Sequence, residues 1–263
     1  MIGKIYLHRI LWFLAGSLSF AAALTGVLNP GIYSMVISAE IMPGVLSQDI
    51  ITIAASITIL AVAVRIKEED TARQIVILGM LGYLFYAYGI YVIERVYNVL
   101  YLLYLAIFTL SFYTIIYGVA SIRREIPPKT ELPGIMRNTA VVFLAAIPLI
   151  FINLWIGQLL PLLQTGRKIE FYYSIYILDL CFVMPAFLIL AYMTAKKEGL
   201  GLLLAPALFI KGFTLFFALS LGETLKPLYG LTTDMSWMWF SLVFSLLFLA
   251  LTFSYLRNLR INT

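Results

Sequence analysis

Two ionisable residues lie inside long apolar runs of the sequence. Asp179 falls within Ile175–Pro185, and Lys211 falls within Pro206–Gly212. A charge in a hydrocarbon environment is costly, so such residues usually pair with each other or mark a binding or transport path. Helix rise places Asp179 about 10 Å, and Lys211 about 16 Å, from the ends of their runs that lie away from the short turn at 196–199. We therefore expect an Asp179–Lys211 ion pair, which either stabilises two helices or forms a polar site.

A second group of polar residues lies in the first half of the chain. Asp49 lies near the start of an apolar run, Tyr83 and Tyr86 share one helix face, and a short turn follows them. These residues are compatible with aromatic packing beside a solvated turn, or with a hydroxyl-lined pocket for a flat or amphipathic ligand. The ligand-binding candidates are Asp179, Lys211, Asp49, Tyr83, Tyr86, Glu94, Arg95 and Asn98.

Several kinds of chemistry are excluded by residue counts. The chain has one cysteine, Cys181, and one histidine, His8. It therefore cannot form an internal disulfide, a CxxC redox pair, a cysteine-based zinc site or a haem site with two histidine ligands. Phosphate-binding glycine loops and the G-x-S-x-G and HExxH motifs are also missing. We predict no catalytic residue, no metal and no cofactor.

The composition is that of an integral membrane protein. Of the 263 residues, 62% are hydrophobic and 12% are charged, and the mean hydropathy is +0.98. Soluble domains average about 45–50% apolar and about 25% charged residues. The chain lacks the polar surface that a soluble domain, a disordered chain or a nucleic-acid-binding protein needs.

Eight segments are long enough to cross a bilayer, which takes about 20 mostly apolar residues. The predicted spans are roughly 8–28, 48–66, 74–93, 99–121, 138–159, 173–195, 200–222 and 237–257. The predicted fold is therefore all-α, a single transmembrane helix bundle over residues 1–263.

The basic residues predict the orientation of this bundle. Thirteen Lys and Arg residues lie at one set of span ends and four at the other, and Lys211 lies within a span. Because cytoplasmic loops are enriched in Lys and Arg, both termini are predicted to be cytoplasmic. The net charge of +5 is then a topology signal. We expect a multi-pass protein of a prokaryotic plasma membrane.

The loop at 123–137 is the longest on the predicted cytoplasmic side and divides the chain into two sets of four spans. It contains Pro127, Pro128 and Pro133. Both halves begin and end on the same side, so the chain is compatible with a parallel tandem repeat. The repeat halves would be 1–122 and 138–263, although apolar segments also align by chance.

The first predicted outer loop is unusually apolar. It runs from Asn29 to Ser47 and contains Ile32, Tyr33, Met35, Val36, Ile37, Ile41 and Met42. A segment this short cannot span the membrane. We expect it to pack on the outer ends of the spans, either as an interfacial segment or as a lid over an outward-facing cavity.

Several stretches together resemble an uncharacterised family of small prokaryotic polytopic integral membrane proteins. The stretches are Asn29–Tyr33, Gln48–Asp49, Gly82–Tyr88, Tyr97–Phe108, Asp179–Pro185 and Leu204–Gly212. The resemblance implies a shared fold pattern to which Asp49, Asp179 and Lys211 belong, and it implies no activity. The apolar first outer loop departs from the more charged loop of that family.

The sequence favours a small transporter or ligand-binding membrane protein with a polar site in the outer half of the bilayer. The expected surroundings are the lipid bilayer and a small-molecule or lipid ligand, with no nucleic acid. A non-catalytic accessory or assembly subunit of a membrane complex is the main alternative, and it would have a protein partner. An intramembrane enzyme acting on a lipid or isoprenoid is less favoured, because no motif supports it.

Overall fold

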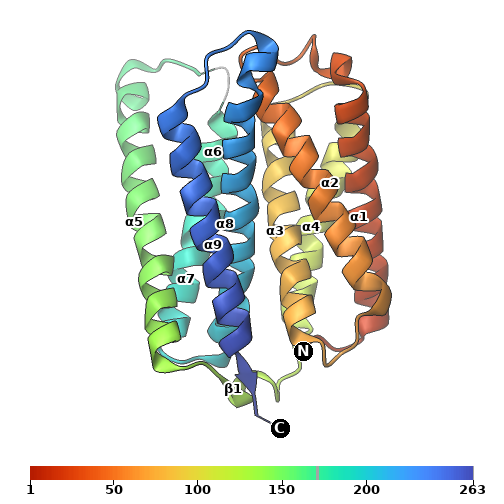
Figure 1. Cartoon of the computed structure of the whole chain (residues 1–263), viewed down its shortest axis with the longest axis vertical. Coiled ribbons are helices and arrows are strands. Elements are labelled where there is room, and N and C mark those ends of the chain that lie inside the picture. The colour runs from red at the N-terminus through yellow and green to blue at the C-terminus, as the bar shows by residue number, and fades with distance from the viewer. Residues whose placement is uncertain (170–171, 263) are drawn as a thin grey trace. The chain divides into compact units, whose positions relative to one another are not determined.

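The computed structural model describes residues 1–169 and 172–262 and is 80% helical. Its longer helices are α1 (Ile5–Leu28), α2 (Met42–Arg65), α3 (Thr71–Ile93), α4 (Tyr101–Ala120), α5 (Gly134–Thr165), α6 (Tyr173–Leu178), α7 (Met184–Ala195), α8 (Gly199–Leu225) and α9 (Met235–Asn258), as Figure 1 shows. The short helices are η1 (Pro30–Tyr33), η2 (Pro127–Lys129), the π-helical η3 (Asp179–Val183) and η4 (Lys226–Tyr229). Two short strands, β1 (Thr130–Glu131) and β2 (Arg260–Ile261), pair antiparallel, with Thr130 opposite Ile261.

Among the residues that the structure describes, eight helical segments are long and apolar enough to cross a membrane, and α6, η3 and α7 together form one of them, Tyr173–Ala195. The predicted all-α bundle of about eight helices is confirmed. The largest difference in bounds is in the fifth segment, predicted at 138–159 and observed as Gly134–Thr165. This helix continues past Trp155 through Pro161. The chain is a multi-pass membrane protein by the length and composition of these helices.

Two compact units make up the chain. Unit 1 comprises Met1–Arg123 and Ala207–Phe253, and unit 2 comprises Arg124–Pro206 and Ser254–Thr263. These units do not follow the sequence halves 1–122 and 138–263. Compactness does not measure internal similarity, so the tandem repeat stays a prediction.

In unit 1, α1 packs against α2 and α4, and α3 packs against α2 and α4. The core of this unit combines aliphatic and aromatic side chains: Ile59 and Trp12 are fully buried, and Phe216 stacks on Phe248 with ring centroids 5.7 Å apart. Gly79 of α3 lies against Ile210 of α8, where an added Cβ would come within 2.6 Å of the Ile210 Cβ. Small residues permit this close approach of membrane helices.

In unit 2, α5 packs against α7, and the sixth span changes from α to π geometry at Asp179–Val183. Pro185 follows directly, in the first turn of α7. A proline has no N–H to donate to the carbonyl four residues earlier and its ring crowds that carbonyl. Here that carbonyl belongs to Cys181, inside the π-helix, so the wider turn coincides with the position that the proline disturbs.

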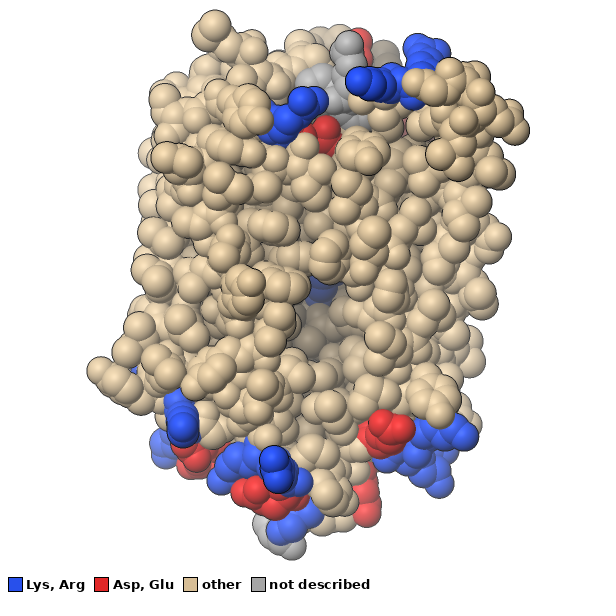
Figure 2. All heavy atoms as spheres, turned by 180° about the vertical axis from the view of Figure 1, so that it is seen from behind, with Lys and Arg blue, Asp and Glu red and all other residues tan. Residues whose placement is uncertain are grey.

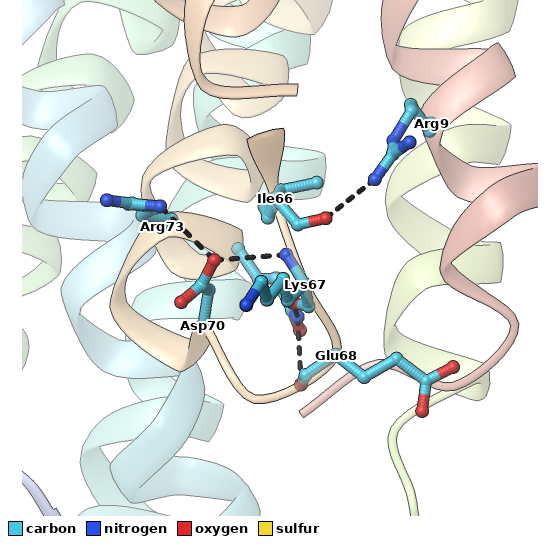
Figure 3. A network of polar contacts seen from close by, with 7 residues as sticks. Arg9, Ile66, Lys67, Glu68, Asp70 and Arg73 are labelled. Atoms are coloured by element: carbon cyan, nitrogen blue, oxygen red, sulfur yellow. Dashed lines mark hydrogen bonds and ion pairs between the residues drawn. The ribbon is translucent and has the colours of Figure 1, made fainter. Parts of the chain in front are cut away.

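The loop between α2 and α3 is closed by polar contacts (Figure 3). Asp70 Oδ2 accepts hydrogen bonds from the Lys67 backbone N–H (3.0 Å) and from Arg73 Nη1 (3.2 Å). Arg9 Nη2 donates to the Ile66 carbonyl at 2.7 Å. The buried Gln74 side chain donates to the carbonyls of Lys67 and Glu68. On the face shown in Figure 2, most charged side chains lie toward the helix ends, and one basic side chain is visible midway between them.

Candidate functional site: Asp49 and its tyrosines

Asp49 is a buried carboxylate held by two tyrosine hydroxyls. It lies in the second turn of α2, about 10 Å along the helix from Met42, and its exposed fraction is 2%. Tyr33 donates its hydroxyl hydrogen bond to Asp49 Oδ2 at 2.8 Å, and Tyr91 donates to Oδ1 at 3.0 Å. Tyr33 comes from η1 and Tyr91 from the last turn of α3. Each carboxylate oxygen therefore has its own phenol donor.

The hydrogen bonds continue from Tyr33 to the turn between α3 and α4. Tyr104, in the first turn of α4, donates to the Tyr33 hydroxyl at 3.4 Å. Asn98 Nδ2 donates to the Tyr104 hydroxyl at 3.0 Å, while its Oδ1 accepts the Leu100 backbone N–H. Ring centroids lie 4.8 Å apart for Tyr91 and Tyr104. We call the residues Tyr33, Asp49, Tyr91, Asn98 and Tyr104 the Asp49 cluster.

The remaining side of Asp49 is closed by the backbone of α1. A Cβ added to Gly26 would overlap Asp49 Oδ2 and would lie 2.6 Å from the Tyr33 hydroxyl oxygen. Only glycine leaves space for the carboxylate at this position. The cluster thus takes residues from η1, α2, α3, α4 and the turn between α3 and α4, and α1 closes it with Gly26, near the end of unit 1 where α1 and α3 end.

No cation neutralises Asp49 within the described residues, 1–169 and 172–262, because none of their ion pairs involves it. The nearby short helix η4 contacts α2, but its Lys226 Nζ pairs with Glu223 Oε2 at 2.8 Å. Burial raises the pKa of Tyr33 above its usual range, so this phenol stays a neutral donor. A buried carboxylate with only neutral partners in a spanning helix is a functional-site hypothesis by default.

Tyr83 lies about two turns before Tyr91 in α3, farther from the end of that helix. Its hydroxyl donates to the Gln48 carbonyl at 2.9 Å and lies 3.3 Å from Thr52 Oγ1. Tyr88 likewise donates to the backbone carbonyl of Ser19 at 3.1 Å. These two tyrosines follow the expectation of packed rings with hydroxyls bonded to the backbone. Tyr33 and Tyr91 do not, because they bond to a side-chain carboxylate.

Lys211 and Tyr86 form a second feature of unit 1. The Lys211 Nζ lies 3.8 Å from the centroid of the Tyr86 ring, and both side chains are buried. A cation over the face of an aromatic ring is attracted by the ring quadrupole, by about 2 kcal/mol or more where water is excluded. Gly82, one turn before Tyr86, lies beside the lysine stem, where an added Cβ would make an ordinary contact of 3.7 Å with the Lys211 Cβ.

Glu94 and Arg95 lie in the turn after α3. Glu94 is the C-cap residue of α3, and its N–H donates to the Ile90 carbonyl. Arg95 is exposed and has a positive φ of 56°. Of the three polar candidates in this turn, Asn98 belongs to the Asp49 cluster.

Asp179 belongs to unit 2, at the first residue of the π-helix. Its Oδ2 accepts a hydrogen bond of 2.9 Å from Trp155 Nε1 of α5. The Trp155 ring meets the Tyr176 ring edge to face, and Tyr176 donates to Gln158 Oε1 at 2.9 Å. Since Asp179 lies in unit 2 and Lys211 in unit 1, the Asp179–Lys211 pair stays a prediction.

Sequence reasoning identified Asp49 but missed most of its partners. Tyr33 was noted only as part of an apolar loop, and Tyr91, Tyr104 and Gly26 were not singled out as site residues. A signal was available: these residues lie within a few positions of the helix ends that meet near Asp49. Ranking every polar side chain by its depth in the bundle would have brought them together.

No known protein family, curated protein or solved structure matches the chain. Within the described residues, no group of three or more His, Cys, Asp and Glu side chains is placed to hold a metal ion. The fold and the site define a class: a multi-pass membrane protein with a buried carboxylate among tyrosines.

Proposed function

We propose that the protein is a small transporter or ligand-binding membrane protein whose polar site is centred on Asp49. The observation that carries this proposal is the burial of the Asp49 carboxylate among neutral hydroxyl donors. A purely structural role is poorly served by such a group, because apolar side chains of similar volume usually stabilise an interior at least as well. Polar groups are kept in membrane interiors chiefly where they bind or pass something.

The proposed membrane is a prokaryotic plasma membrane, with both termini in the cytoplasm. The thirteen-to-four distribution of Lys and Arg between the two sets of span ends supports this orientation. Asp49 then lies in the outer half of the bilayer. Single cysteines placed in a Cys181→Ser background at 29–47 or 224–236 should react with an impermeant maleimide from outside in intact cells, and those at 123–137 should not. The reverse pattern would contradict the orientation.

The segment between α1 and α2 is proposed to cover the site. Tyr33 and Ile37 of this segment are buried, whereas Met35 is 96% exposed. Tyr33 is thus the member of the Asp49 cluster that bonds to the carboxylate from a connecting segment and not from a spanning helix. Movement of η1 would remove one donor from Asp49 and open a path for a small polar or amphipathic ligand.

The experiment is a ligand screen by thermal unfolding of the purified protein in lipid nanodiscs. Small polar metabolites and single-chain lipids are compared on the unchanged protein, Asp49→Asn and Asp234→Asn. Asp234 is the matched control, since its exposed carboxylate caps the Trp237 N–H and asparagine caps equally well. A compound that raises the unfolding temperature of the first and third proteins but not of Asp49→Asn supports the proposal. Equal stabilisation of all three places binding elsewhere and contradicts it.

A further inference from the structure

The way in which Asp49 is enclosed indicates what the carboxylate can bind. Oδ2 lies between the Tyr33 hydroxyl and the backbone of Gly26, and Oδ1 faces the Tyr91 hydroxyl. Hard metal cations take many oxygen ligands at once; Ca²⁺, for example, takes six to eight. Here both carboxylate oxygens already accept hydrogen bonds from close neighbours.

We propose that Asp49 is a reversible proton-binding site, and that a proton is the cation exchanged there. A proton needs no additional volume: it binds one carboxylate oxygen, and the neighbouring phenol rotates from donor to acceptor. Release restores the carboxylate with two phenol donors. The inference takes from the proposed function only that Asp49 is the centre of the site.

The groups around Asp49 keep their charge, so the charge changes on Asp49 itself. They are Tyr33 from η1, Tyr83, Tyr88 and Tyr91 from α3, and Tyr104 from α4, while α1 presents Gly26. Phenols ordinarily ionise near pH 10, so the tyrosines supply hydrogen bonds and no countercharge. The short helix η4 also contacts α2, and its Lys226 pairs with Glu223 of α8.

The Asp49 cluster also supplies a route for the proton. A chain of hydrogen bonds leads away from Asp49. Tyr33 donates to Asp49 at 2.8 Å, Tyr104 donates to Tyr33 at 3.4 Å, and Asn98 donates to Tyr104 at 3.0 Å. In an inward transfer, Tyr33 gives its proton to Asp49 and receives one from Tyr104. Tyr104 is itself 1% exposed, so its replacement proton has to enter from water through the turn that holds Asn98. Asn98 is half-buried at that turn and holds the Tyr104 oxygen in place. Each phenol ends neutral, and the net change is one proton moved from water to the carboxylate.

The test uses dicyclohexylcarbodiimide, an apolar reagent that adds the O–H of a protonated carboxylic acid across its C=N bond. The full chain in liposomes is treated at pH 5 to 9 in potassium or sodium salt at constant ionic strength, and peptide mass spectrometry maps the product. We expect modification at Asp49 that falls as the pH rises, is equal in both salts and is missing in Asp49→Asn. Lack of modification of Asp49 at every pH, or protection by sodium, would overturn the proposal.

A conservative variant separates a titrating site from a merely reactive one. Tyr33→Phe removes a donor that favours the charged carboxylate, so modification should persist to higher pH by about one unit. Tyr97→Phe is the matched control, because Tyr97 is exposed and contacts the ring of Tyr101. An unchanged profile in Tyr33→Phe would contradict the proposal. Failure of the ligand screen leaves these labelling results unaffected, so the two proposals fail separately.

Discussion

Asp49 and Asp70 lie near opposite ends of α2 in the same unit, and their surroundings differ in kind. Asp70 is partly exposed, with 26% of its side-chain surface accessible, and it contacts Arg73 and the Lys67 backbone N–H. Asp49 is buried and accepts its hydrogen bonds from two phenols. Figure 3 shows Asp70 closing a loop with local partners. The two phenol partners of Asp49 come instead from η1 and α3, far from it in the sequence.

The difference shows that the role of an acidic residue is indicated by its burial and by its partners. Exposed pairs such as Asp70–Arg73 contribute about 0–1 kcal/mol and are screened by salt. They close loops and mark the ends of spans. A buried carboxylate with neutral partners imposes a desolvation cost that a loop contact does not. This contrast supports the proposal of a site at the Asp49 end of unit 1, whereas the contacts of Asp70 hold a loop.

The largest expected effect is that of Asp49→Leu. Leucine fills the volume but leaves the buried hydroxyls of Tyr33 and Tyr91 without their acceptor. Each buried donor left unsatisfied costs about 1–3 kcal/mol, so we expect a loss of about 2–6 kcal/mol of stability. Reversible unfolding in mixed micelles measures it.

A triple variant is the control for Asp49→Leu. Adding Tyr33→Phe and Tyr91→Phe removes the two stranded hydroxyls, and replacing all partners by apolar groups can be nearly neutral. The triple variant should therefore recover much of the lost stability. Recovery should be incomplete, because Tyr33→Phe also removes the acceptor of the long Tyr104 hydrogen bond. If the triple variant is no more stable than Asp49→Leu alone, the loss does not come from the two stranded hydroxyls.

A smaller effect is expected from Gly26→Ala, which tests how tightly α1 closes the site. The new methyl group would overlap Asp49 Oδ2, and overpacking typically costs about 1–3 kcal/mol. Gly157→Ala is the matched control, since an added Cβ in that helix meets nothing within 4 Å. The unfolding temperature should fall for Gly26→Ala and stay level or rise for Gly157→Ala. Equal behaviour of the two variants would show that α1 does not press on Asp49.

The arrangement of spans was predictable because it follows from length and hydropathy. A helix of about 20 apolar residues has few alternatives in a bilayer, so the eight segments were found with bounds close to those observed. The extension of α5 to Thr165 was missed because Gln158, Pro161 and Gln164 interrupt the apolar pattern. The π-helix at Asp179–Val183 leaves no hydropathy signal at all.

The sequence was enough to predict which ionisable residues lie within the spans, but not which side chains contact them. Asp49, Asp179 and Lys211 could be singled out because ionisable residues in spans are rare and costly. Which tyrosine reaches Asp49 depends on how each helix is rotated about its axis, and an almost wholly apolar helix gives little amphipathic pattern to fix that rotation. The fold of the connecting segment, which turns Tyr33 inward at η1, depends on tertiary packing.

The smallest effect is expected from Arg73→Gln, at the Asp70 end of unit 1. The Arg73 side chain is 59% exposed and lies 3.2 Å from Asp70 Oδ2, so its removal should cost about 0.2–1 kcal/mol. Asp70 keeps its bond to the Lys67 N–H. Because exposed charges are screened with a Debye length of about 3 Å at 1 M salt, the difference from the unchanged protein should shrink as salt is added. The loss caused by Asp49→Leu should change little with salt, since interactions buried inside the bundle are screened much less than exposed ones. A salt-independent loss of several kcal/mol for Arg73→Gln would remove the distinction between the two ends of α2.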